Sequence, residues 1–203
     1  SGTLPGKTLL LHHKTLESGY LAAQEKASEL GNDLTCAGFD TVEELVEYIG
    51  EAIGMGYDNI YIDSLSAVNS LKLTTLKATK KPKETIWDVF GQLGESMERL
   101  VLLCKQTAAD TGINMFLTMA YKIKDNDLEA DLKGNITAAA ITKLCPNVLA
   151  VKGEMDEDGN LKRRLITKTD GLYPARVDGL LDSNNPAILE ANLGEFLNLF
   201  KGE

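Results

Sequence analysis

The sequence has few cysteines, no long apolar run and no excess of basic residues. Its three cysteines, at positions 36, 104 and 145, form neither a CxxC pair nor a Cys/His cluster of zinc spacing. Isolated cysteines in apolar surroundings are typical of a reduced, cytoplasmic protein and exclude a disulfide framework. The apolar runs fall short of the roughly 18 residues that a membrane-spanning helix needs. We therefore expect neither a membrane span nor a signal peptide.

Positive charge is also scarce. The chain has 21 Lys and Arg against 30 Asp and Glu, which gives a formal net charge of −9. No global basic field draws such a chain to nucleic acid, so any nucleic-acid binding must come from a local patch. With 203 residues, 43% of them hydrophobic, the chain suits one α/β domain spanning residues 1–203.

Apolar segments of strand length alternate with segments of helical periodicity, which predicts an α/β fold with a mostly parallel central sheet. We expect strands at 7–13, 33–39, 60–62 and 113–119, and helices at 17–30, 42–54 and 86–110. An antiparallel hairpin is expected near the C-terminus, from strands 146–152 and 161–169 around an acidic turn at 156–160. A short helix is expected at 193–200.

The segment that ends in Asp63 and Ser64 is the centre of this pattern. An aspartate that follows a buried parallel strand lies at the carboxyl edge of the sheet, where open α/β folds bind ligands. There it can hold Mg²⁺, and the polar side chains of Thr118 and Tyr121, after the next strand, could sense a terminal phosphate. The alternatives are that Asp63 only caps the following helix and that 113–119 is a core strand ending in a loop.

Gly6-Lys7-Thr8 matches the end of a phosphate-binding loop, in which Lys7 and Thr8 would contact a nucleotide. Position 1 is serine where the motif has glycine, however, and no strand precedes the match. The other interpretation makes 7–13 a buried strand after a Pro-Gly turn, which places any true phosphate loop before Ser1. We favour this second interpretation.

Two polar segments carry the lysines that could contact DNA. The first, 69–85, is expected to be a mobile basic loop with no acidic residue before Glu84, and such a loop can track a phosphate backbone. The second, 122–137, is a loop of mixed charge. The alternative for the first is an ordinary solvated surface loop, and the mixed charge of the second makes DNA contact less evident there. Trp87 is expected to pack rather than to serve as a ligand platform. The candidate lysines are Lys72, Lys77, Lys80, Lys81, Lys83, Lys122 and Lys124.

Taken in order, these segments resemble the RecA-like recombinase ATPases, and most closely the small phage proteins that act in single-strand annealing. The resemblance implies a RecA-like three-layer core, ATP and Mg²⁺ as cofactors, and the two polar loops as contacts to single-stranded DNA. By resemblance Asp63 is the magnesium-side acid with Ser64 beside the nucleotide, and Lys168 and Arg176 reach the ATP of a neighbouring subunit. It also implies a homo-oligomeric ring or filament. The alternative for Lys168 and Arg176 is that they are charged residues at strand ends that face solvent.

The family also carries an acid just after its equivalent of strand 9–13, to activate the attacking water. This chain has His12, His13 and Lys14 there, so Glu17 is the nearest carboxylate and the candidate catalytic base. Three functions follow: a nucleotide-dependent DNA-binding protein of recombination or annealing, a P-loop ATPase that uses Gly6-Lys7-Thr8, or a non-hydrolysing assembly protein with the same fold.

Overall fold

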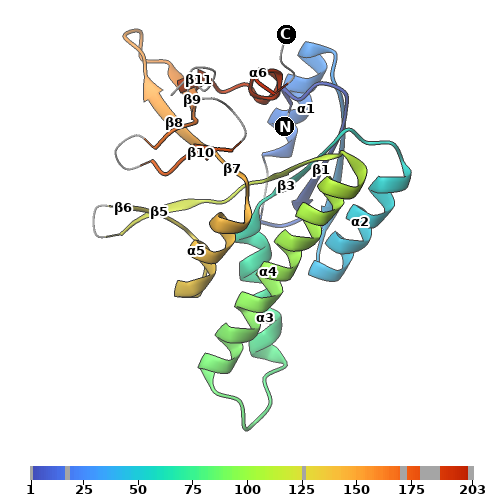
Figure 1. Cartoon of the computed structure of the whole chain (residues 1–203), viewed down its shortest axis with the longest axis vertical. Coiled ribbons are helices and arrows are strands. Elements are labelled where there is room, and N and C mark those ends of the chain that lie inside the picture. The colour runs from blue at the N-terminus through green and yellow to red at the C-terminus, as the bar shows by residue number, and fades with distance from the viewer. Residues whose placement is uncertain (1, 17–18, 125–126, 170–172, 179–187, 201–203) are drawn as a thin grey trace. The chain divides into compact units, whose positions relative to one another are not determined.

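A computed structural model describes residues 2–16, 19–124, 127–169, 173–178 and 188–200 (Figure 1). The chain divides into two compact units. The expectation of one domain over residues 1–203 stays a prediction. The first comprises Ser1–Lys122 and Glu129–Leu144, and the second comprises Ile123–Leu128 and Cys145–Glu203.

A four-stranded parallel sheet forms the centre of the first unit. Its strands are β1 (Lys7–His13), β2 (Asp33–Phe39), β3 (Asn59–Asp63) and β4 (Asn114–Leu117), in the order β2-β1-β3-β4. β1 is almost fully buried and no residue of β3 is exposed, as expected for parallel strands covered on both faces. The expected α/β fold with a parallel central sheet is confirmed.

Five helices accompany this sheet: α1 (Tyr20–Leu30), α2 (Val42–Gly54), α3 (Leu65–Ala78), α4 (Ile86–Thr111) and α5 (Asn135–Leu144). Side-chain caps fix where three of them begin, because Thr41, Ser64 and Thr85 each accept a hydrogen bond from a backbone N–H three residues on. Gly31 and Gly112 end α1 and α4 in the left-handed conformation that glycine adopts without penalty. α1 begins at Tyr20, three residues later than its periodicity predicts.

The segment 69–85 is not a loop, and this prediction was wrong. α3 continues through it to Ala78, and only residues 79–85 connect α3 to α4. Lysine and leucine are good helix formers, and no glycine or proline interrupts the segment before Pro82. Leu65, Val68 and Leu73 are buried at helical spacing, so the inner face holds the helix whatever the polar face carries.

The second polar segment, 122–137, is also more regular than expected. It contains most of β5 (Tyr121–Lys124), all of β6 (Asp127–Ala130), which pairs with β5, and the start of α5.

The second unit contains a three-stranded antiparallel sheet, in the order β11-β9-β8, and a short pair of β7 and β10. Its elements are β7 (Asn147–Val148), β8 (Ala150–Met155), β9 (Leu161–Ile166), β10 (Arg176–Val177), β11 (Ile188–Glu190) and α6 (Leu193–Asn198). The acidic turn between β8 and β9 is confirmed, since Asp156 Oδ1 accepts hydrogen bonds from the backbone N–H groups of Asp158 and Asn160. The predicted strand 146–152 is split between β7 and β8.

The three cysteines are free thiols, with Cys104 buried and the other two half-buried. Burial raises the pKa of the Cys36 thiol. No helix among the described residues is long and apolar enough to cross a bilayer.

Candidate functional site

The carboxyl ends of β3 and β4 bring Asp63 and Thr118 together. Asp63 is the last residue of β3, and Thr118 directly follows β4. Because the two strands are parallel neighbours, with Ile62 in register with Leu117, the residues after that pair meet at one edge. Thr118 Oγ1 donates a hydrogen bond to Asp63 Oδ1 at 2.7 Å. The predicted placement of Asp63 at the sheet edge beside the end of the next strand is confirmed.

Backbone hydrogen bonds hold this pair in place. The Thr118 N–H donates to the carbonyl of Ile62 at 3.1 Å, and the Leu65 N–H donates to the carbonyl of Thr118 at 2.8 Å. Ser64, rather than Asp63, is the N-cap of α3, and its Oγ accepts from the Ala67 N–H at 3.2 Å. The alternative in which Asp63 caps the helix is therefore wrong, and the Asp63 side chain faces Thr118 instead.

The end of β1 and the start of α1 lie on the other side of Asp63. His12 is in register with Asp63 across the β1–β3 pair, and its ring stacks on Tyr20, with centroids 4.3 Å apart. A Cβ at Gly19, the residue before α1, would lie 3.9 Å from Asp63 Oδ2. The first turn of α1 thus approaches the carboxylate, and helix N-termini carry partial positive charge that favours an anion nearby.

This arrangement fits a magnesium ion held by one protein carboxylate. Thr118 orients one Asp63 oxygen, and the other faces the space beside Gly19. Within the described ranges, no three His, Cys, Asp or Glu side chains gather into a metal-binding group. Mg²⁺ is commonly bound by one or two carboxylates, with water and substrate phosphates completing its octahedron. Water and substrate phosphates would supply the remaining ligands of such an ion.

Lys7 and Thr8 are not part of a phosphate loop, so their assignment as nucleotide-binding residues through that loop is corrected. Both lie at the amino end of β1, while Asp63 ends β3 at the carboxyl edge. The Lys7 N–H donates to Asp58 Oδ2, and Lys7 Nζ donates to the carbonyl of Met55. The favoured interpretation, a strand over 7–13, is confirmed to the residue.

Two further predicted residues of this edge have different outcomes. Glu17 lies outside the described residues. Tyr121 begins β5 and is half-buried, and burial raises the pKa of its phenol.

Lys168 and Arg176 belong to the second unit. Lys168 lies just after β9, and Arg176 begins β10 and donates to the carbonyl of Cys145.

The candidate DNA-contacting lysines separate into two groups. Lys77 lies in the last turn of α3, and Lys80, Lys81 and Lys83 lie in the turn between α3 and α4. In contrast, Lys72 forms an ion pair with Glu43 at 3.2 Å. In β5, Lys122 pairs with Asp131 at 3.5 Å, and the side chain of Lys124 lies outside the described part of the chain.

Sequence reasoning missed two features. The stack of His12 on Tyr20 beside Asp63 joins two segments that no motif connects, although the ends of β1 and β3 had to share an edge. Trp87 was expected to pack and does not, because its side chain is 78% exposed. Its position in the first turn of α4, next to the turn lysines, was the available signal.

Replacing Thr118 with valine is expected to weaken Mg²⁺ binding at Asp63 by about tenfold, as loss of an outer-shell partner commonly does. Valine keeps the shape of the side chain but removes the hydroxyl that donates to Asp63 Oδ1. Titration of Mg²⁺ into the unmodified protein and its variants measures the effect. Thr118→Ser is the control, since it keeps the hydroxyl and should keep the affinity; equal affinities for all three proteins would contradict a role for this hydrogen bond.

No family model and no curated protein matches this chain. Among solved structures it is similar to a KaiC-like protein, PH0186, from the hyperthermophilic archaeon Pyrococcus horikoshii OT3. The sequences are 12% identical, the alignment covers 85% of this chain and 68% of that chain, and the TM-score is 0.39.

Proposed function

We propose that this chain is a RecA-like, nucleotide-dependent protein that binds single-stranded DNA in phage-type recombination or annealing. The observation that carries the proposal is the contact of Thr118 with Asp63 at the carboxyl edge of two parallel strands. This is the place where open α/β sheets bind ligands, and the chemistry of a threonine-oriented carboxylate suits Mg²⁺ bound to nucleotide phosphates.

In this proposal Asp63 holds Mg²⁺, Thr118 orients the carboxylate, and Ser64 lies next to the nucleotide while capping α3. Bound Mg²⁺ would neutralise phosphate charge during ATP hydrolysis. Glu17, the first carboxylate after β1 in the sequence, is the candidate base for the attacking water. Lys168 and Arg176 are candidates to reach the ATP of a neighbouring subunit in a ring or filament, and the core is of the three-layer RecA type.

Positive charge gathered at one place supports the DNA-binding part. Lys77, Lys80, Lys81 and Lys83 lie within seven residues, at the end of α3 and in the turn that follows it. A chain with a formal charge of −9 would repel DNA over most of its surface, so the approach is directed to this turn.

Asp63→Asn tests the nucleotide site. The substitution keeps the shape of the side chain and removes its charge, so Mg²⁺ should no longer improve ATP binding. We expect the affinity for ATP in Mg²⁺ to fall by at least about tenfold, the loss typical of damage around a metal site. Calorimetric titration of ATP with Mg²⁺ and with EDTA measures both affinities on the same protein.

Lys7→Ala is the matched control. Lys7 donates to Met55 and Asp58 at the amino end of β1, so its loss should leave ATP affinity unchanged. A loss of ATP binding in Lys7→Ala with retention in Asp63→Asn would reverse the assignment and restore Gly6-Lys7-Thr8 as the phosphate loop. If the unmodified protein does not bind ATP, the nucleotide part of the proposal is wrong.

A further inference from the structure

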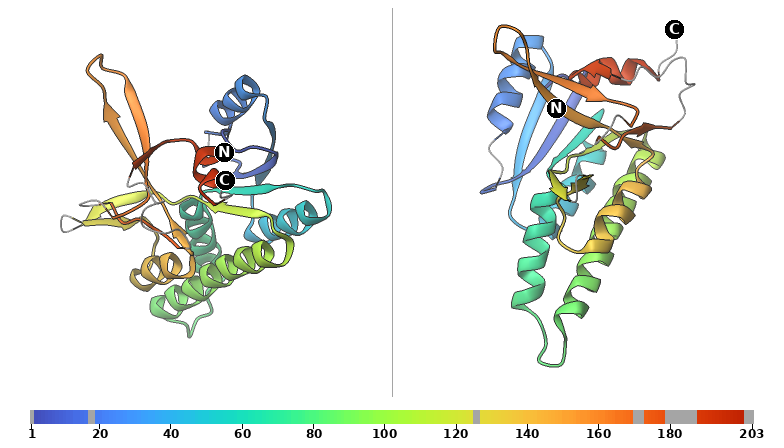
Figure 2. Two further views of the ribbon diagram at one scale, coloured as in Figure 1. Left: turned by 45° about the horizontal axis from the view of Figure 1, so that its top comes forward. Right: turned by 90° about the vertical axis from the view of Figure 1, so that its left-hand side faces the viewer.

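The turn between α3 and α4 concentrates basic residues at the end of a helical hairpin. Figures 1 and 2 show α3 and α4 side by side and continuing away from the parallel sheet to this turn. Residues 77–88 contain four lysines and two acids. α3 has 14 residues, which separate the turn from Asp63 by about 21 Å of helix.

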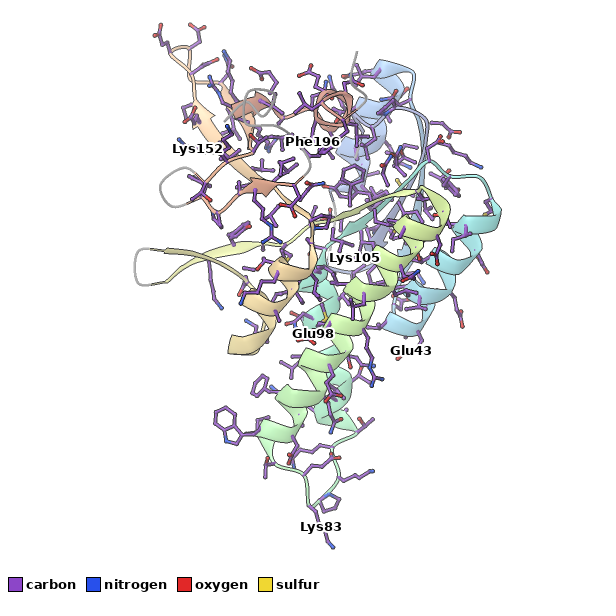
Figure 3. All side chains as sticks on the ribbon, in the orientation of Figure 1. Glu43, Lys83, Glu98, Lys105, Lys152 and Phe196 are labelled. Atoms are coloured by element: carbon purple, nitrogen blue, oxygen red, sulfur yellow. The ribbon has the colours of Figure 1, made fainter. Side chains whose placement is uncertain are left out.

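Both acids of this segment are occupied by the local backbone. Glu84 Oε2 accepts from the Lys81 N–H at 2.8 Å, and Asp88 forms a capping box with Thr85. The hydrogen bonds from Thr85 hold the pKa of Asp88 below its usual value. Across the described residues, none of Lys77, Lys80, Lys81 and Lys83 forms a salt bridge with a carboxylate within 4.0 Å. All four side chains are exposed to solvent, and Figure 3 shows Lys83 projecting from the turn.

Trp87 is the single tryptophan of the chain, and it lies in the first turn of α4 with 78% of its surface exposed. Side chains on a helix lean toward its N-terminus, which for Trp87 is the side of the lysine turn. Gly91, one turn further on, has no side chain, and a Cβ there would meet nothing within 4 Å. With 78% of its surface exposed, the indole is open to solvent.

We infer that Trp87 is a stacking platform for a base of single-stranded DNA whose phosphates contact Lys77, Lys80, Lys81 and Lys83. This inference rests on the DNA binding proposed above and adds the residue that stacks on a base. Charge selects an anionic ligand, and an exposed aromatic ring beside cationic side chains is the combination with which proteins hold single strands.

The apolar surface here favours a nucleic acid over a lipid bilayer. A helix that lies in a membrane interface needs a wide apolar face. Near the turn, the exposed large hydrophobic side chains are Ile86 and Trp87 alone among the described residues. One ring and one aliphatic side chain suffice for stacking on a base but present little area to acyl chains.

Because Trp87 is the only tryptophan, its fluorescence reports directly on this site. The unmodified protein is titrated with a thymidine oligonucleotide, with heparin, which has charge but no bases, and with phosphatidylglycerol vesicles. The oligonucleotide should quench the emission with saturation, whereas heparin should bind without quenching and the vesicles should cause no change.

Affinity measured by anisotropy of a labelled oligonucleotide then tests the variants. Trp87→Leu should weaken binding by about tenfold, which corresponds to the loss of one stacked base, without changing the salt dependence. Trp87→Phe keeps an aromatic ring and should stay within about threefold of the unmodified protein. Leu102→Ala is the control, since Leu102 is a 47% exposed residue of the same helix, 15 residues after Trp87, and should have no effect.

The outcomes separate this inference from the proposed function. Oligonucleotide binding without quenching, or with equal affinity in Trp87→Leu, overturns the stacking role and leaves the DNA-binding proposal standing. Absence of oligonucleotide binding overturns both. Quenching or a blue shift with vesicles but not with the oligonucleotide identifies the turn as a lipid-binding site and likewise overturns the inference.

Discussion

Glutamine in place of Lys77, Lys80, Lys81 and Lys83 together is expected to remove most of the salt dependence of single-stranded DNA binding. Each phosphate neutralised on a single strand contributes a slope of about −0.7 in log affinity against log salt, so four contacts contribute about −2.8. Between 1 M and 0.1 M salt, that slope corresponds to a change in affinity of about 600-fold. Binding measured from about 0.05 to 0.5 M salt gives both quantities.

Lys105→Gln is the matched control for this variant. Lys105 is an exposed lysine of α4, about 27 Å along the helix from Trp87, and Figure 3 shows it toward the sheet while Lys83 lies at the turn. Its loss should change the slope by less than one contact. An unchanged slope in the four-lysine variant would remove the DNA-binding proposal, and an equal change in Lys105→Gln would indicate binding by diffuse charge.

The second large effect is expected on stability, at the amino edge of the sheet. Asn59 is 1% exposed, and its Nδ2 donates to the carbonyl of Pro5 at 2.7 Å and to Thr8 Oγ1 at 3.1 Å. Its Oδ1 accepts from Asn114 Nδ2 at 3.0 Å. Asn59→Ala removes these hydrogen bonds and leaves the buried Thr8 Oγ1 without this donor, so it should lower the free energy of unfolding by about 2–4 kcal/mol.

Asn114→Ala separates the buried network from a surface contact. Asn114 is exposed, and its removal deletes one donor while Asn59 keeps its other bonds, so we expect a loss of about 1 kcal/mol or less. Urea denaturation followed by circular dichroism measures both values. Equal losses for the two variants would show that burial of Asn59 adds nothing to the cost.

The same network explains why Gly6-Lys7-Thr8 is a false match to a phosphate loop. Thr8 Oγ1 is buried and bonded to Asn59, and Lys7 is bonded to Met55 and Asp58. The three residue types that suit a phosphate also suit a turn leading into a buried strand. The preceding proline and the apolar run to His13 distinguished the two interpretations in the sequence.

Regular elements with a buried face could be predicted from the sequence. β1 and β2 have the predicted bounds, and α2 and α4 begin at or next to the predicted residues, because apolar periodicity and capping residues are local signals. The position of Asp63 followed from the same logic, since a parallel strand that ends in a carboxylate must place it at the carboxyl edge.

The sequence by itself determined the alternating α/β order, the parallel sheet and the edge at which Asp63 lies, because periodicity and chain direction are properties of each segment alone. Only the tertiary structure decided which of the described lysines form ion pairs with carboxylates, that 69–78 is helical, and that Trp87 faces solvent. Those outcomes depend on which partners, such as Glu43 for Lys72, lie across from a side chain. Partners distant in the sequence leave no local pattern to read.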